Sequence, residues 1–284
     1  MRHEDRNPRV SIVMPYYNHG KFIDEAVASI DKFADKNIYE VIIVNDGSTD
    51  SYSNERLEEL AKTGMYKIVH QQNQGVCVAR NNAIKYARAE YILPVDSDNK
   101  IQIEFISEGM AILDNRPEIS VVYTDYTVFG VQNGVTKSGP FNLQRLMLDN
   151  FIENCSMFRK RIFDELGGYD PFFNKIGIED WEFWLKVAFA GHRFHYIEKP
   201  LFDYRMSETS RTVRLITDKT KGDVFSDYVI KKHTEYFGHQ YVDQYFLNKF
   251  KPNFIGFMIK VVLRLYFPKI YQILVDKKKL RKYL

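Results

Sequence analysis

The chain has 284 residues, of which 45% are hydrophobic and 27% are charged. A chain of this length can bury a large core, and this composition excludes an intrinsically disordered protein. Its two cysteines, Cys77 and Cys155, are too few for a disulfide framework, so we expect a reducing, cytoplasmic compartment. The first ten residues, MRHEDRNPRV, are polar, and we expect no secretory signal.

Charge is distributed unevenly along the chain, whose overall net charge is +3. From Lys251 to the end there are nine Lys and Arg residues and one acid, Asp276, which give this segment +8 and leave −5 on the first 250 residues. Because the basic residues are confined to one terminal segment, we do not expect nucleic-acid binding. The basic excess instead indicates a separate role for the C-terminal segment.

Strand and helix patterns alternate over the first hundred residues. Short apolar runs predict buried strands at residues 10–15, 39–44, 66–71 and 91–95. Apolar residues at helical spacing predict helices within residues 19–33, around Leu57 and Leu60, and over residues 75–87, the last beginning at Gly75. This alternation is typical of βαβ units, so we expect an α/β fold with a mainly parallel sheet flanked by helices.

After Asn99 the alternation becomes less regular. Residues 119–126, ISVVYTDY, predict another strand, and the Asn-Gly pair in GVQNGVTK is typical of a hairpin turn. A helix is predicted to end at Gly167 and Gly168, and another follows within residues 174–191.

Three polar clusters, Tyr16–Asn18, Asn45–Asp50 and Asp96–Asn99, come directly after predicted strands. In open α/β sheets ligands bind outside the carboxyl ends of the strands, so we expect the three clusters to form one site. The third cluster places Asp96 and Asp98 on either side of a serine. Alone, this pattern is typical of a turn, but two carboxylates one residue apart can also bind one Mg²⁺ or Mn²⁺ ion.

Five motifs, SIVMPYYN, VIIVNDGSTD, NQGVCVARNNAI, VDSD and GIEDWEFWLK, resemble in order and approximate spacing those of the family 2 inverting glycosyltransferases. The resemblance covers roughly residues 9–211 and implies a GT-A fold. It implies a catalytic domain at residues 1–215, with a nucleotide-binding half near 9–100 and an acceptor half near 101–215, before a basic helical extension at 216–284. The implied reaction transfers a sugar from a UDP-sugar to an acceptor hydroxyl.

The resemblance also implies a binding site for the nucleotide. Pro15 and Tyr17 would bind the donor, with Tyr17 lying against the nucleobase, and Asp46 would accept a hydrogen bond from the uracil imide N–H. Arg80 would reach the nucleotide from the start of its helix, where backbone donors also favour anions. Each residue has a structural alternative: Tyr17 as a cap on the strand end, Asp46 as a turn residue, and Arg80 as a surface cation.

A metal site is implied beside the nucleotide. Asp96 would face the ribose or bridge to Mn²⁺ or Mg²⁺, and Asp98 would bind the ion directly, so that it stabilises charge on the departing diphosphate. One departure concerns a His that many relatives carry shortly after a Tyr-Arg pair, because this chain has Ser207 there. The third ligand is left open, and Arg205 and Arg211 are candidates for phosphate contacts.

Glu179 and Asp180 are the implied catalytic pair. Inversion in a single displacement requires a carboxylate that takes the proton of the acceptor, and Asp180 resembles that base, while Glu179 would orient the acceptor or the base. Trp181 would form a wall of the acceptor site, although core packing is the commoner role of tryptophan. Adjacent acids also favour the first turn of a helix, and the two interpretations are compatible.

The C-terminal segment predicts an amphipathic helix with aromatic residues and a basic end. Its apolar face would hold Phe254, Phe257, Met258, Val261 and Leu265. No apolar stretch approaches the roughly 20 residues of a transmembrane helix, whereas a basic amphipathic helix can lie in the membrane interface. We expect a peripheral protein on the inner face of the plasma membrane that acts on a lipid-linked acceptor. The alternative is a helix packed on the catalytic domain or on a partner chain.

The expected context is the synthesis of O-antigen, capsule or exopolysaccharide. A nucleotidyltransferase is less well supported, because PYYNHGK is a poor match to a Gly-rich basic phosphate loop. An inactive sugar-nucleotide-binding scaffold is disfavoured by the intact Asp98 and Asp180 but favoured by the missing His. Sugar selectivity would depend on the loops around residues 124–156.

Overall fold

The computed structural model describes residues 2–175 and 177–207, and beyond them the short stretches 228–233, 235–237, 262–263, 266–267 and 269–270. The chain divides into two compact units, residues 1–222 and 223–284. All the strands and the site discussed below belong to the first unit. The residues of the expected apolar face, Phe254, Phe257, Met258, Val261 and Leu265, all lie outside the described residues.

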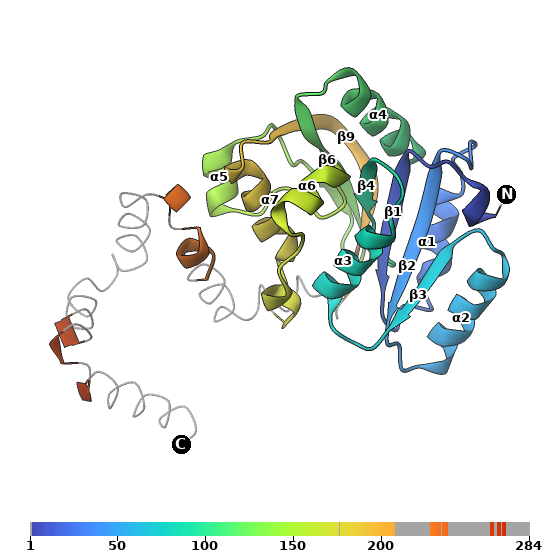
Figure 1. The fold of residues 1–284 in the computed structure, drawn as a ribbon, viewed down its shortest axis with the longest axis horizontal. Helices are drawn as coiled ribbons and strands as arrows, with labels where there is room; N and C mark the ends of the chain where they lie inside the picture. Colours follow the sequence, from blue (N-terminus) through green and yellow to red (C-terminus); the bar gives the residue numbers. More distant parts are fainter. Residues whose placement is uncertain are drawn as a thin grey trace. The chain divides into compact units, whose positions relative to one another are not determined.

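The first unit is built on a nine-stranded sheet, and its N-terminal half is parallel (Figure 1). In spatial order the parallel strands are β3 (Lys67–Gln71), β2 (Tyr39–Asp46), β1 (Val10–Tyr16) and β4 (Tyr91–Pro94). Every residue of β1 and β2 is buried, because helices cover both faces of the sheet here. This two-sided burial explains why both strands appear in the sequence as continuous apolar runs.

Helices cover the two faces of the parallel strands. The helices of this half are α1 (Ile23–Ile30), α2 (Ser51–Lys62), α3 (Val76–Tyr86) and α4 (Ile103–Asn115). Apolar residues of α1, α2 and α4 share one core cluster with alternate residues of β1, including Ile12 and Met14. Helix α3 contacts β1 and β2, and its buried residues lie outside that cluster. Because successive strand residues point to opposite faces, α3 covers the other face.

The second half extends the sheet with mixed pairing. The strands are β5 (Lys100–Ile101), β6 (Ile119–Gly130), β7 (Gly134–Thr136), β8 (Met157–Arg159) and β9 (Arg193–Met206). Strand β8 lies between β4 and β6 and is antiparallel to both, whereas β9 is parallel to β6. The predicted hairpin is confirmed, since β6 and β7 are antiparallel and Val128 pairs with Gly134.

The remaining elements of the first unit are short. They are α5 (Leu143–Leu148), α6 (Lys160–Leu166), α7 (Glu179–Phe189) and the 3-10 turns η1 (His3–Asp5) and η2 (Pro171–Lys175). Helix α6 ends as predicted at Gly167, whose φ of 80° is in the left-handed region. The expected α/β fold with a mainly parallel N-terminal sheet is therefore confirmed, but β9 was not predicted.

Candidate active site

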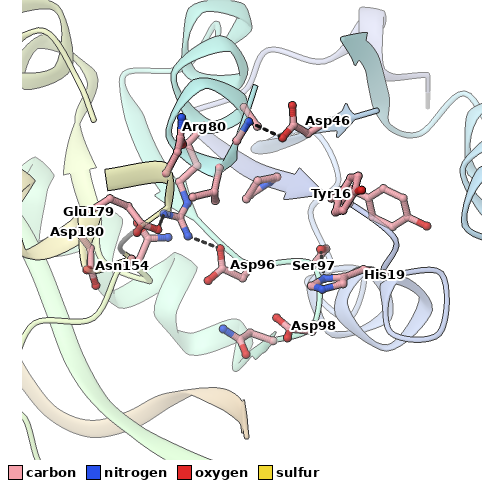
Figure 2. Close-up of a pocket in the computed structure, with 18 of the residues that line it drawn as sticks. Tyr16, His19, Asp46, Arg80, Asp96, Ser97, Asp98, Asn154, Glu179 and Asp180 are labelled. Atoms are coloured by element: carbon pink, nitrogen blue, oxygen red, sulfur yellow. Dashed lines mark hydrogen bonds and ion pairs between the residues drawn. The ribbon is translucent and has the colours of Figure 1, made fainter. Parts of the chain in front are cut away.

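A cavity of about 1330 Å³ lies at the carboxyl ends of the parallel strands. Residues from all three predicted polar clusters line it: Tyr17 after β1, Asp46 at the end of β2, and Asp96 and Asp98 after β4. Asp180, from the first turn of α7, lines the same cavity. In Figure 2, Glu179 and Asp180 lie on one side of this space, while His19 and Tyr16 lie on the other. The structure thus brings together residues that are far apart in the sequence.

Asp46 shapes the loop that precedes α3. Its side chain is buried, and Oδ1 accepts hydrogen bonds from Gln71 Nε2 and from the backbone N–H of Gln74, both at 2.8 Å. Its Oδ2 accepts from the backbone N–H of Gly75, also at 2.8 Å. A carboxylate oxygen can accept two hydrogen bonds, so Oδ2 retains capacity for a ligand donor. The ring of Tyr17, 42% exposed, and Pro15 line the cavity near this point.

Asn18 fixes the turn after β1 and was not singled out from the sequence. Its backbone φ is 54°, a left-handed conformation that asparagine tolerates better than most residues. Its side-chain oxygen accepts from the backbone N–H of Thr49 at 2.8 Å, and its Nδ2 donates to Thr49 Oγ1 at 3.0 Å. These bonds join the ends of β1 and β2, which carry Tyr17 and Asp46.

Asp96 and Asp98 lie on a tight turn after β4. Burial raises the pKa of Asp98, and the nearby negative charge of Asp96 raises it further. Two carboxylates that disfavour each other's charge form a donor set that fits Mn²⁺ or Mg²⁺. Among the described residues, no group of three His, Cys, Asp or Glu side chains is arranged to hold a metal ion. An ion held by Asp96 and Asp98 would therefore take further ligands from substrate phosphates or water.

Arg205, a candidate for phosphate contacts, holds the turn that carries Asp98. Its Nε donates to the backbone carbonyl of Asp98 at 3.0 Å, and its guanidinium lies 4.7 and 4.5 Å from the ring centroids of Phe22 and Phe129. Its terminal nitrogen Nη2 donates to Glu25 Oε2 at 2.9 Å. Arg205 does line the cavity, as does Ser207, while Arg211 lies outside the described residues.

Arg80 joins both halves of the site. It is 3% exposed, and its guanidinium donates to Asp96 Oδ1 at 2.6 Å and to Glu179. It thereby links α3, the turn after β4 and the first turn of α7 (Figure 2). The sequence predicted that Arg80 reaches the nucleotide directly. In the structure it lines the cavity with its terminal nitrogens bound to these two carboxylates, so it sets the positions of two acids.

Asp180 has the properties of a base that works near neutral pH. Burial raises its pKa to about 7, with a contribution from the charge of Glu179, while the cation of Arg80 opposes the rise. Its Oδ1 accepts from Asn150 Nδ2 at 3.2 Å and from the backbone N–H of Trp181 at 2.9 Å. Within the part of the chain that the structure describes, no donor reaches Oδ2. That oxygen is available to a hydroxyl group in the cavity.

The backbone that leads into α7 is strained. Ile178, directly before Glu179, has a φ of 57°. The left-handed conformation is costly for a β-branched residue, and such strain is concentrated at functional sites. Ile178 lines the cavity, whereas Trp181 is not among the residues that line it. The indole N–H of Trp181 donates to the carbonyl of Leu146 at 2.5 Å, which joins α7 to α5, so its role as an acceptor wall stays a prediction.

Three residues that the sequence did not single out also line the cavity: Asn150, Glu153 and Asn154, on the segment between α5 and β8. Burial raises the pKa of Glu153 to about 8, and the charge of Asp180 contributes to this rise. The sequence signal available for them was weak. They are polar residues in an otherwise apolar segment, within the region where selectivity for the sugar was expected.

Comparison with known proteins identifies the family. The model of the family described as Glycosyl transferase family 2 matches residues 11–167. A putative glycosyltransferase of Bacillus subtilis, EpsH, is 27% identical over 218 residues, which cover 72% of this chain and 62% of EpsH. An uncharacterized glycosyltransferase of Methanocaldococcus jannaschii is 24% identical over 95% of both chains. This chain therefore spans a little over three fifths of the length of EpsH.

Solved structures show the same fold. TarS of S. aureus, solved in complex with UDP-GlcNAc, superposes with a TM-score of 0.62 at 23% identity, covering 72% of this chain and 60% of that chain. A mannosyltransferase of Pyrobaculum calidifontis, in complex with GDP-Man and Mn²⁺, has a TM-score of 0.57 at 17% identity and covers 75% and 61% of the two chains. These similarities confirm the expected GT-A architecture.

Proposed function

Because this chain belongs to glycosyl transferase family 2, we propose that it transfers a sugar from a UDP-sugar to an acceptor hydroxyl, with inversion at the anomeric carbon and with Mn²⁺ or Mg²⁺. One observation carries the proposal: Asp98 and Asp180 line the same cavity. An inverting displacement needs the leaving diphosphate and the base on opposite sides of one carbon, and a shared cavity is the minimum condition for that arrangement.

The nucleotide would bind at the ends of β1 and β2. Oδ2 of Asp46 has capacity to accept the uracil imide N–H, and the ring of Tyr17 would stack on the base. Asp96 and Asp98 would hold the divalent ion, which neutralises negative charge on the departing UDP. TarS was solved with UDP-GlcNAc, which supports a uridine nucleotide, whereas the mannosyltransferase with the same fold was solved with GDP-Man.

The acceptor would react at Asp180. Oδ2 of the ionised Asp180 would accept the proton of the acceptor hydroxyl while the hydroxyl oxygen bonds to the anomeric carbon. The bond from that carbon to the phosphate oxygen breaks in the same step, and UDP leaves. Asn150 and the backbone N–H of Trp181 hold the carboxylate through Oδ1, so its orientation is fixed before the substrates bind. Burial raises the pKa of Asp180 to about 7, and the negative charge of Glu179, which Arg80 holds beside it, adds to the rise.

We further propose a lipid-linked acceptor at a membrane surface, in the synthesis of a bacterial cell-surface polysaccharide. The support is the basic excess after Lys251 together with the exposed apolar residues described there: Tyr266 is 72%, Phe267 51% and Ile270 49% exposed. Aromatic residues next to basic ones favour the membrane interface. Among the described residues, no helix is both long and apolar enough to cross a membrane.

A metal-dependent screen tests the proposed activity. Purified full-length chain is incubated with each of several UDP-sugars, with Mn²⁺, with Mg²⁺ or with EDTA, and released UDP is measured. We expect release from at least one donor, its loss in EDTA, and a fall of at least about a hundredfold in Asp98→Ala. Asp164→Ala, on an exposed part of α6, is the matched control and should retain activity. Tight binding of UDP-sugars without any release, even with lipid-linked acceptors, would instead favour the inactive scaffold.

A further inference from the structure

The segment between α5 and β8 contributes to the cavity two buried polar atoms that have no hydrogen-bond partner among the described residues. Asn154 is 6% exposed; its Oδ1 accepts from the hydroxyl of Tyr169 at 2.9 Å, but its Nδ2 has no hydrogen-bond partner within the described part of the chain. Asn150 donates through Nδ2 to Asp180, and no described residue contacts its buried Oδ1 through a hydrogen bond. Buried polar groups are nearly always hydrogen-bonded, so unpaired ones at a cavity wall indicate a polar ligand.

Glu153 lies between these two asparagines in the sequence and faces the same space. Tyr126 also lines the cavity, and its hydroxyl lowers the pKa of Glu153 against the effect of burial. Burial raises the pKa of Glu153 to about 8, and the charges of both Asp180 and Asp96 contribute. At neutral pH its carboxyl is therefore mainly protonated and can donate as well as accept a hydrogen bond.

The position of Glu153 identifies which part of the substrate it would meet. In the proposed reaction the diphosphate binds beside Asp96 and Asp98, and the acceptor hydroxyl meets Asp180. Glu153 lines the same cavity as Asp96 and Asp180, and Asn150, on the same segment as Glu153, donates a hydrogen bond to Asp180. The sugar ring that is transferred has to occupy the space between the diphosphate and the acceptor hydroxyl.

We propose that Asn150, Glu153 and Asn154 form a subsite that binds hydroxyl groups of the transferred sugar and selects an uncharged sugar over one that carries a carboxylate. This inference rests on the proposed function. Asn154 Nδ2 donates to a sugar hydroxyl oxygen, Asn150 Oδ1 accepts from a sugar hydroxyl, and the Glu153 carboxyl does either. The hydroxyl groups of a bound sugar would supply the hydrogen-bond partners of Asn154 Nδ2 and Asn150 Oδ1.

Charge supplies the selectivity. Of the four acids in this part of the cavity, Glu153 is mainly protonated at neutral pH, and Asp96 and Glu179 are paired with Arg80. Among the described residues, Asp180 is therefore the acid here that has no cation beside it in an ion pair. A sugar carboxylate placed beside the ionised Asp180 would be repelled by it, and Arg80 is already engaged with two other carboxylates. A neutral hydroxyl at the same position makes hydrogen bonds without that cost.

Calorimetric binding with Mn²⁺ at pH 7 tests the subsite. The ligands are UDP, UDP-glucose with UDP-glucuronate, and UDP-galactose with UDP-galacturonate, because the members of each pair differ only at carbon 6. Either UDP-glucose or UDP-galactose will bind more tightly than the other. We expect this preferred donor to bind at least about tenfold more tightly than the UDP-uronate of the same pair. Equal affinity within both pairs would overturn the selectivity.

Substitutions separate the subsite from the nucleotide site. Asn154→Ala should weaken the preferred UDP-sugar about fivefold, the usual worth of one hydrogen bond, and leave the affinity for UDP unchanged. Glu153→Ala should act similarly, whereas Glu153→Gln, which keeps a neutral hydrogen-bonding group, should stay within about twofold of wild type. Glu118→Gln, in an exposed ion pair with Arg116, is the matched control and should change nothing.

The outcomes distinguish this inference from the proposed function. Unchanged affinities in all variants, or equal losses for UDP and the UDP-sugar, would overturn the subsite while metal-dependent UDP binding still supported the donor site. Absence of any binding of UDP or UDP-sugars would overturn the proposed function and the subsite together.

Discussion

Asp180 gains its chemical character from its surroundings rather than from its type. A solvated Asp has a pKa near 3.9 and is a weak base at neutral pH. Burial in the cavity wall and the adjacent Glu179 raise the pKa of Asp180 to about 7, so its carboxylate binds a proton more strongly. The match between this pKa and the working pH is what general-base catalysis favours.

The pH dependence of turnover should report this pKa. Because the pKa of Asp180 is raised, the residue is protonated below about pH 7 and ionised above it, so kcat should rise with pH through about 7. Asp180→Asn should lower kcat at least about a hundredfold at every pH. Glu179→Gln removes a negative neighbour and should move the rise to lower pH. A wild-type profile that is flat between pH 5 and pH 8 would exclude Asp180 as the base.

At the scale of elements, Arg80 holds the turn after β4 and the start of α7 in fixed positions relative to each other. It extends from α3 and bridges the acid after β4 and the acid at the start of α7. Without Arg80, Asp96 and Glu179 would be left with unbalanced negative charge beside Asp180. Replacing one partner of a buried ion pair is costly because the remaining charge stays desolvated.

We expect Arg80→Met to lower the free energy of unfolding by about 3 kcal/mol, at the low end for a buried pair because the side chain of Asp96 is 31% exposed. Urea unfolding followed by circular dichroism measures this change. The double variant Arg80→Met, Glu179→Gln should regain part of the loss, since it removes one of the unbalanced charges. A loss below about 1 kcal/mol in the single variant would show that the bridge is not structural.

The N-terminal elements could be predicted from the sequence because local pattern and tertiary environment agree there. The apolar runs of β1 and β2 are buried on both faces, and Gly75 and Gly167 mark the helix ends that they were expected to mark. Strand β9 could not be predicted, because Pro200 interrupts its pattern and its register with β6 shifts near Asp125. Strand β8 has only three residues.

The sequence predicted those residues of the candidate site that lie at the end of a strand or at the start of a helix. Asp46, Asp98 and Asp180 follow a strand or begin a helix, and the structure brings all three to one cavity. The tertiary pairing of Arg80 with two acids has no local signal. Glu153 and Asn154 lie on a segment without regular structure, so only the folded chain shows that they line the cavity.

At the scale of the whole molecule, charge separates the C-terminal segment from the catalytic part. The segment after Lys251 carries +8, while the preceding residues carry −5. Such a distribution favours an anionic surface as the partner of the tail and leaves the catalytic part free of strong attraction to it. A transferase with a lipid-linked acceptor would gain from this arrangement, since its substrate is confined to the membrane.

Deletion of the residues after Pro252 should abolish association with vesicles that contain anionic lipid, measured by cosedimentation, and release the protein from the membrane fraction of cells. Replacing Lys277, Lys278 and Lys279 with Gln should weaken vesicle binding, because each basic residue near the surface contributes about 1 kcal/mol. Raised salt should do the same to the wild type. Equal membrane association of the full-length and truncated chains would refute the proposed role of the tail.

The central claim is that the cavity holds UDP and its ion beside Asp98 and the base at Asp180. Calorimetric titration of UDP in the presence of Mn²⁺ into wild type, Asp98→Ala and Asp180→Asn tests it most directly. We predict that Asp98→Ala weakens UDP binding at least about tenfold, while Asp180→Asn binds UDP within about twofold of wild type although it cannot transfer sugar. Undiminished Mn²⁺-dependent binding of UDP by Asp98→Ala would contradict the account.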